Sequence, residues 1–255
     1  MSIRDAGQEQ LIVATGLYKS FGGEPILLDV GVEVFRGRIL GIIGPGGVGK
    51  SLLMKMLAGL VEPDAGDVTV LGQSLQSLNA SGLARVRDRM GFLFQNYALF
   101  DFMDVGQNIA FPLEQMGVPK AEITRRVAER LAEVELPGIE RLFPNELSGG
   151  MKKRVALARA TIAGAPILLY DDPTAGLDPV TSSKIFELIR RLHRPDGATV
   201  IVGHDIDRMV AVCDEWLLLH EGAVLFRGTT EEGRASSHEV LKTFFMETGM
   251  LGAAA

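Results

Sequence analysis

The stretch Gly44-Pro45-Gly46-Gly47-Val48-Gly49-Lys50-Ser51 fits the pattern G-x-x-x-x-G-K-[ST]. An apolar run at 39–43 precedes it, and apolar residues at helical spacing follow it, which are Leu52, Leu53, Met56, Leu57 and Leu60. A glycine-rich turn between a strand and a helix points its backbone N–H groups at phosphate, and the helix N-terminus adds positive potential. This order of residues predicts a nucleoside triphosphate site rather than a turn without a ligand.

The charged and polar residues of the loop have separate expected tasks. Lys50 places a cation near the β- and γ-phosphates, and Ser51 offers a hydroxyl oxygen to Mg²⁺. We expect the nucleotide to be bound by Gly44, Pro45, Gly46, Gly47, Val48, Gly49, Lys50, Ser51 and Leu52.

The composition describes a folded chain with an acidic balance. Of 255 residues, 47% are hydrophobic, and 32 acidic residues outnumber 26 basic ones. The net charge of −6 argues against broad electrostatic binding of nucleic acid, so no such partner is expected. The single cysteine, Cys213, is expected in the core, which suits a reducing compartment.

Nothing in the sequence predicts insertion into a membrane. The segment Met1 to Gln10 is polar, and no stretch reaches the roughly 20 apolar residues that cross a bilayer. We expect a cytosolic chain, or one held at a membrane by another protein.

Short apolar runs that alternate with helical patterns predict an α/β fold with a mainly parallel sheet. The run 167–170 is apolar throughout, which is typical of a central parallel strand. A turn and strand at 66–71, with the first strands, would add a small antiparallel layer. Further strands are expected at 11–14, 39–43, 90–94, 199–202 and 216–219, and a helix around 185–192.

Residues 96–164 depart from this alternation. Ile123, Val127, Leu131 and Val134 form one face of a helix that begins near Pro119, and a second helix is expected after Ser148. We interpret 96–164 as a helical subdomain within one domain, 1–255, whose core comprises 11–95 and 165–228. In the tail, 229–255, the apolar segment 240–250 is expected either to pack on the core or to contact a neighbouring subunit.

The run 167–170 ends in Asp171, and phosphate-loop NTPases hold Mg²⁺ with such a carboxylate opposite the loop serine. The motif Leu147-Ser148-Gly149-Gly150-Met151 precedes this strand. With the three motifs in this order, nearly the whole chain resembles the ABC-type ATPases. The resemblance implies a RecA-like, mainly parallel core, a small antiparallel β layer and an inserted helical subdomain, with ATP and Mg²⁺ as cofactors.

The resemblance also implies roles for single residues. Gln95 matches the glutamine that senses Mg²⁺ and the attacking water, and His204 matches the switch histidine at the γ-phosphate. Asp178 matches a loop residue that faces the partner domain, and Phe21 matches the aromatic ring against adenine. The implied metal ligands are Ser51, Gln95 and Asp171, and the implied catalytic residues are Lys50, Gln95, Asp172 and His204.

Ser148, Gly149 and Gly150 open a helix and form a second anion-binding end. In the family this end grips ATP held by a second subunit. Because the chain has one set of motifs, the resemblance implies a homodimer or a separate partner ATPase. It also implies a multi-spanning permease, accessory subunits, and a peripheral position at the cytoplasmic face of the inner (plasma) membrane.

Two positions depart from the common family pattern. Asp172 stands where a general-base glutamate is usual, one methylene shorter, so slow hydrolysis is expected unless the backbone shifts to compensate. The alternative is that Asp172 only caps the turn at Pro173 and catalysis depends on His204. Met151 stands where glutamine is usual. With the sequences at 94–100 and 108–113, Met151 resembles the ATPases of Mla/Mce-type lipid transporters.

The leading prediction is an ATP-hydrolysing subunit that energises transport of phospholipid or a related lipid through a permease. The alternatives are transport of amino acids or lipoproteins, and a slow-hydrolysing non-transport ABC protein. An apolar cluster after Gln95 is expected either to form the groove for a permease helix or to fill the core of the helical subdomain. Its members are Tyr97, Leu99, Phe100, Phe102 and Met103.

Overall fold

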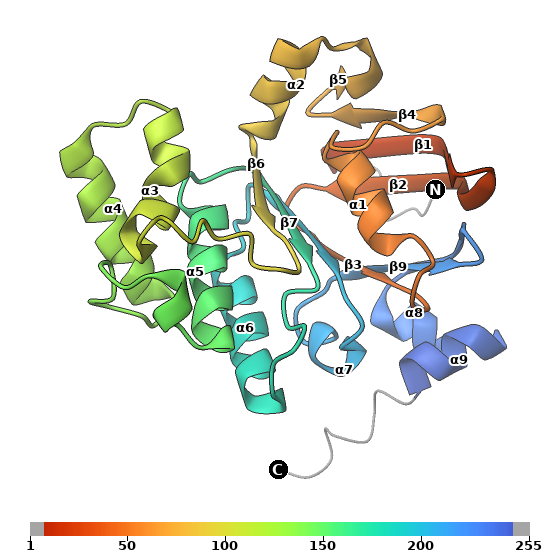
Figure 1. Ribbon diagram of the computed structural model, residues 1–255. Coiled ribbons are helices and arrows are strands. Elements are labelled where there is room, and N and C mark those ends of the chain that lie inside the picture. Colours follow the sequence, from red (N-terminus) through yellow and green to blue (C-terminus); the bar gives the residue numbers. More distant parts are fainter. Residues whose placement is uncertain (1–7, 247–255) are drawn as a thin grey trace.

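A six-stranded sheet in the order β10-β9-β3-β8-β7-β6 runs through the centre of the computed structural model, which describes residues 8–246 (Figure 1). The strands from β9 to β6 are parallel to their neighbours, and β10 is antiparallel to β9. All five residues of β3 and of β7 are buried, as expected for central parallel strands. The strands are β3 (Ile39–Ile43), β6 (Met90–Leu93), β7 (Ile167–Asp171), β8 (Ala198–Val202), β9 (Glu215–His220) and β10 (Ala223–Gly228).

A smaller antiparallel sheet has the order β2-β1-β4-β5, which confirms the predicted antiparallel layer. Its strands are β1 (Gln10–Phe21), β2 (Glu24–Phe35), β4 (Ala65–Val70) and β5 (Gln73–Ser74). The strand predicted at 11–14 is only the beginning of β1. Register shifts along the β1–β2 pair interrupt the two-residue alternation, so the sequence pattern shows neither the length of β1 nor the bounds of β2.

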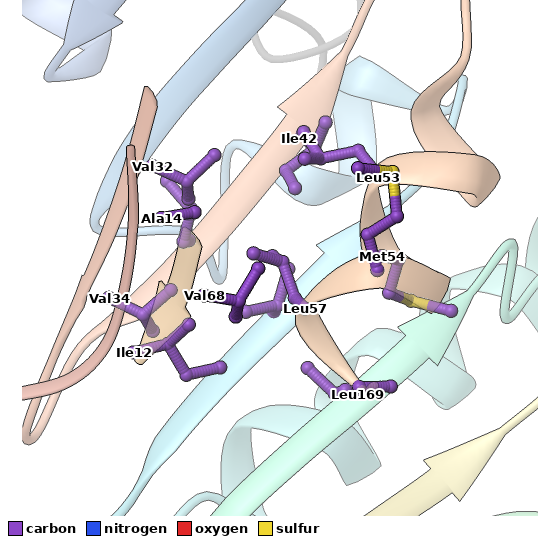
Figure 2. Close-up of a cluster of buried hydrophobic side chains, with 14 of the residues drawn as sticks. Ile12, Ala14, Val32, Val34, Ile42, Leu53, Met54, Leu57, Val68 and Leu169 are labelled. Carbon is purple, nitrogen blue, oxygen red and sulfur yellow. The ribbon is translucent and has the colours of Figure 1, made fainter. Parts of the chain in front are cut away.

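Helix α1 (Lys50–Leu57) lies between the two sheets and joins them. Figure 2 shows Leu53, Met54 and Leu57 of α1 among side chains of both sheets, including Ile12, Val68, Ile42 and Leu169. Leu60 continues the helical spacing in the sequence but lies beyond the end of α1. Gly59, at φ +64°, turns the chain after the helix, and Leu60 is 42% exposed.

The helical subdomain contains α3 (Val105–Gln115), α4 (Lys120–Glu133) and α5 (Gly149–Thr161), drawn at the left of Figure 1. It has a hydrophobic cluster of its own, to which all three helices contribute. α4 begins directly after Pro119, whereas Val134 is the C-cap residue beyond its end. The same subdomain includes the short η3 (Pro144–Glu146), and helical segments elsewhere are η2 (Leu75–Ser77), α2 (Ala80–Arg87), α6 (Pro179–Leu192) and α7 (Ile206–Met209).

The described part of the C-terminal tail packs on the core. It forms α8 (Thr230–Ala235) and α9 (Glu239–Met246), and the buried Phe245 ring meets Trp216 edge-on at 5.6 Å between centroids. Trp216 Nε1 also donates a hydrogen bond to Thr230 Oγ1 at 2.9 Å. Cys213 is buried as expected. Of the predicted domain and its tail, residues 1–7 and 247–255 lie outside the described residues.

Across residues 8–246, the structure contains no helix that is long and apolar enough to cross a bilayer.

Replacing Phe245 with alanine should lower the free energy of unfolding by about 3 kcal/mol, because the change leaves a cavity beside Trp216. Urea denaturation followed by circular dichroism measures this difference. The matched control is Phe102→Ala, which removes a 77% exposed ring and should change stability by less than about 0.5 kcal/mol. Equal effects of the two substitutions would contradict the packing of α9 described above.

Candidate active site

Most of the predicted site residues follow the carboxyl ends of four consecutive parallel strands, β3, β8, β7 and β6. Gly44 comes directly after β3, and Asp171 is the last residue of β7. Gln95 and His204 come shortly after β6 and β8. Ligands of open α/β sheets bind at this edge, so the topology places residues distant in sequence around one location.

The phosphate loop has the backbone that its glycines permit. Gly49 is the N-cap of α1 at φ +104°, and a Cβ there would lie 2.8 Å from Leu27 Cδ2, so a larger residue does not fit. Lys50 Nζ donates hydrogen bonds to the carbonyls of Gly44 and Pro45, each at 2.8 Å. Burial lowers the pKa of Lys50, while the charges of Asp172 and Asp171 oppose this shift. The amine is therefore held within the loop.

Ser51 and Asp171 meet across the site, as the Mg²⁺ prediction requires. Ser51 Oγ donates a hydrogen bond to Asp171 Oδ1 at 2.8 Å. Burial raises the pKa of Asp171, and the hydrogen bond from Ser51 opposes this shift. Hydroxyl and carboxylate oxygens suit Mg²⁺, which binds few protein ligands and takes the others from phosphate and water. Between residues 8 and 246 no three His, Cys, Asp or Glu side chains gather as a metal site.

Asp172 and His204 form a pair at the same edge. Asp172 Oδ2 lies 3.1 Å from His204 Nδ1, and Asp172 has φ +49°. Asp172 Oδ1 is buried and has no hydrogen-bond partner within the described part of the chain. The turn at Pro173 is closed by the backbone, since the Ala175 N–H donates to the Asp172 carbonyl at 3.1 Å. The Asp172 carboxylate is therefore not the group that closes this turn.

Phe21 lies near the phosphate loop, at the end of β1. Its ring is 53% exposed. A cavity of about 400 Å³ is lined by Phe21 together with Gly47, Gly49, Lys50, Ser51 and Leu52. The ring and the loop thus face one space that suits a nucleotide.

Asp64 fixes the hairpin that carries Phe21, and the sequence analysis missed it. Its carboxylate accepts hydrogen bonds from Lys19 Nζ at 2.7 Å, from the Ser20 N–H at 2.7 Å and from Ser20 Oγ at 3.0 Å. The bond from Lys19, followed by those from Ser20, lowers the pKa of Asp64 to about 2. No local sequence pattern indicates these contacts, because Asp64 is separated along the chain by 45 positions from Lys19 and by 44 from Ser20.

The signature residues and Asp178 lie together but away from this cavity. Ser148 caps α5 by accepting a hydrogen bond from the Met151 N–H at 3.3 Å, and Asp178 caps α6. The two helix starts adjoin, since a Cβ on Gly150 would lie 2.7 Å from Thr181 Cγ2. Over the described range, the cavity lined by Phe21 and Lys50 includes none of Ser148, Gly149, Gly150 and Asp178.

Members of the apolar cluster after Gln95 differ in burial. Tyr97 and Leu99 pack against the core beside the central sheet, and Leu99 also contacts that of the helical subdomain, whereas Phe102 is 77% exposed. Phe100 lines a second cavity of about 480 Å³, where β6 meets α3 and α5. Other residues of this cavity, which we call the β6–α3 groove, include Arg87, Phe94, Phe111, Pro112, Met116 and Arg159.

Comparisons with known proteins agree with this geometry. A family model described as ABC transporter matches residues 27–175. The chloroplastic protein TRIGALACTOSYLDIACYLGLYCEROL 3 of Arabidopsis thaliana is 39% identical, over 92% of this chain and 73% of its own length. The methionine import ATP-binding protein MetN of Caulobacter vibrioides is 41% identical, over 83% of this chain and 64% of its own length.

Solved structures give the same result. The dimeric ATP-binding cassette MJ0796, bound to ADP and Pi in a post-hydrolysis state, aligns with a TM-score of 0.79 and 31% identity, over 86% of this chain and 98% of that one. Cassettes of this kind bind ATP with Mg²⁺, dimerise and pair with a membrane permease, which confirms the expected cofactors and these partners. The chain therefore belongs to the ABC transporter family, as an ATP-binding ATPase subunit.

Proposed function

We propose that the whole chain works as one ATPase domain, peripheral at the cytoplasmic face of the inner membrane, whose closure on ATP drives a permease. The observation that carries this proposal is the division of the motifs into two groups. Lys50, Ser51 and Asp171 meet at the sheet edge, while Ser148 and Asp178 lie outside the cavity of that site. A second subunit placed head-to-tail brings the helix end at Ser148 to the nucleotide of the first.

In this proposal Asp172 accepts a proton from the water that attacks the γ-phosphate. His204, which approaches Asp172 Oδ2, keeps the carboxylate oriented and contacts the γ-phosphate, and the Gln95 side chain orients the water. Lys50 stabilises negative charge on the phosphates. Mg²⁺, when bound by Ser51, Asp171 and Gln95, supplies further charge neutralisation. Since aspartate is one methylene shorter than glutamate, its reach to the water is reduced and turnover is slow.

The Asp172 series tests this role. Asp172→Glu should raise kcat, because it restores the usual reach, whereas Asp172→Asn should lower kcat by about a hundredfold, because an amide cannot accept the proton. Steady-state phosphate release at saturating ATP measures both rates, and the affinity for ATP should stay near that of the native protein. Native turnover in Asp172→Asn would show that Asp172 is not the base.

We infer that Phe21 stacks on adenine and that Asp64 holds the ring in place. Asp64→Asn weakens the bond to Lys19, so the affinity for ATP should fall about three- to tenfold. Equilibrium titration with a fluorescent ATP analogue measures this, and Glu62→Gln, at a nearby exposed carboxylate, is the matched control. Equal affinity of the two variants for the ATP analogue would show that Asp64 does not contribute to nucleotide binding.

We propose that the β6–α3 groove receives the permease. Its aromatic residues Phe100 and Phe111 lie 5.1 Å apart between ring centroids, and the exposed Phe102 stands beside Phe100 at 5.7 Å. An apolar surface of this kind, with Arg159 among its lining residues, suits an amphipathic helix. The groove also adjoins Gln95 through Phe94, so closure at the nucleotide has a short route to the permease.

The transported substrate has two candidates. Amino-acid import, the alternative to the lipid prediction, has the stronger support, because several relatives at 34–41% identity carry the name methionine import ATP-binding protein MetN. Lipid transport is the second candidate, since one relative is named TRIGALACTOSYLDIACYLGLYCEROL 3 and matches 92% of this chain. The signature residue Met151 also supports it.

A reconstituted transport complex tests the substrate. The chain is purified with its permease from native membranes and reconstituted in vesicles, and ATP hydrolysis is measured with methionine outside or with varied phospholipids inside the bilayer. Stimulation of ATP hydrolysis by methionine supports amino-acid import, and lipid-dependent stimulation supports the second candidate.

The same purification from native membranes tests the groove. The Phe102→Asp chain should recover less permease than the native chain, while its unfolding midpoint stays unchanged. Equal recovery would place the permease elsewhere.

A further inference from the structure

Lys153 is fully buried near the start of α5, and its amine lies between two elements of the catalytic edge. Lys153 Nζ donates a hydrogen bond to the Gln95 carbonyl at 2.9 Å and another to the Asp172 carbonyl at 3.1 Å. Gln95 follows β6 and Asp172 follows β7, which are neighbouring parallel strands. One amine thus joins the backbone of both segments to the helix that begins at the signature motif.

The surroundings of this amine disfavour its positive charge, so Lys153 does more than fill space in the core. Burial lowers the pKa of Lys153, while Asp172 and Asp171 oppose this shift, and the Tyr97 ring faces Nζ at 5.0 Å from its centroid. A buried cation is costly unless hydrogen bonds and nearby opposite charge compensate it, and an apolar side chain would fill the same volume more stably. What lysine provides, and an apolar side chain cannot, is therefore the pair of hydrogen bonds to the Gln95 and Asp172 carbonyls.

The segments that Lys153 joins need external support. Tyr97 and Ala98 have φ +60° and +50°, and Asp172 has φ +49°, values that L-residues adopt at an energetic cost. Arg159, further along α5, donates to the Ala98 carbonyl at 2.7 Å and to the Tyr97 carbonyl at 3.0 Å. Two cations of one helix therefore hold the chain after Gln95, and only Lys153 also reaches Asp172.

We propose that Lys153 is a positioning residue that sets the Gln95 and Asp172 segments relative to each other, so that α5 moves with both. When the signature end of α5 engages a nucleotide of the partner subunit, this amine passes the displacement to the general base and the water-orienting glutamine at once. The phosphate loop does not depend on it, because Lys50 Nζ donates to carbonyls of the loop itself and Ser51 donates to Asp171 at the end of β7.

Methionine and glutamine at position 153 give a matched pair, since the two side chains are equally long and differ in the amide donor. Lys153→Met should lower kcat at least tenfold while the affinity for ATP changes less than about twofold, the size expected when a positioning contact but no binding contact is lost. Lys153→Gln should retain at least threefold more kcat than Lys153→Met. Lys152→Met removes a charge from the same turn and should behave like the native chain.

Four readouts separate positioning from a general structural role: kcat, the affinity for a fluorescent ATP analogue, the unfolding midpoint, and amide hydrogen exchange without nucleotide. Faster exchange at 96–98 in Lys153→Met, with α1 unaffected, supports the proposal independently of hydrolysis. Native kcat in Lys153→Met, or a parallel fall of kcat, affinity and unfolding midpoint in both variants, would overturn it. If Lys153→Met does not fold, Lys153→Gln alone decides, because reduced kcat at native affinity is still required.

Discussion

The parallel pairing of β3, β8 and β7 is the constraint on which the site depends. In this register Ile42 pairs with Val202, and Val202 pairs with Asp171, so three strand ends lie in one row. The phosphate loop, His204 and Asp172 all begin just beyond that row. A slip of one residue in either pair would move the loop or the carboxylates by about 3.3 Å along the strand and separate Ser51 from Asp171. Burial of both faces of β3 and β7 makes such a slip expensive.

Fold and family can be predicted from the sequence where they depend on contiguous residues. Consecutive residues are enough to identify the loop 44–51, the all-apolar run before Asp171 and the signature motif. The order and spacing of these motifs therefore predict the core and the sheet edge at which the site lies. The apolar face of α4 was equally clear, because Ile123, Val127 and Leu131 repeat at helical spacing and all are buried.

The parts that the sequence analysis missed depend on long-range contacts or on patterns that compete with each other. β2 was hidden because bulges interrupt its alternation, and α3 contains Pro112, although Asp104 and Gln107 form a capping box at its start. Asp64 and Lys153 act on segments far away in the chain, so neither residue stands out in its local sequence. The substrate is harder still, because the resemblance at Met151 and the similarity to MetN favour different substrates.

Trp216, the only tryptophan in the sequence, sits at a boundary between the sheet and the C-terminal helices. It is fully buried, and a Cβ on Gly41 of β3 would lie 2.9 Å from its ring, just ahead of the phosphate loop. The intrinsic fluorescence of this protein therefore senses the docking of α9 and small displacements of β3, but no nucleotide directly. An emission change on adding ATP would signal that binding is transmitted through the central strand to the C-terminal helices, and so would make this indole a native reporter of communication across the fold.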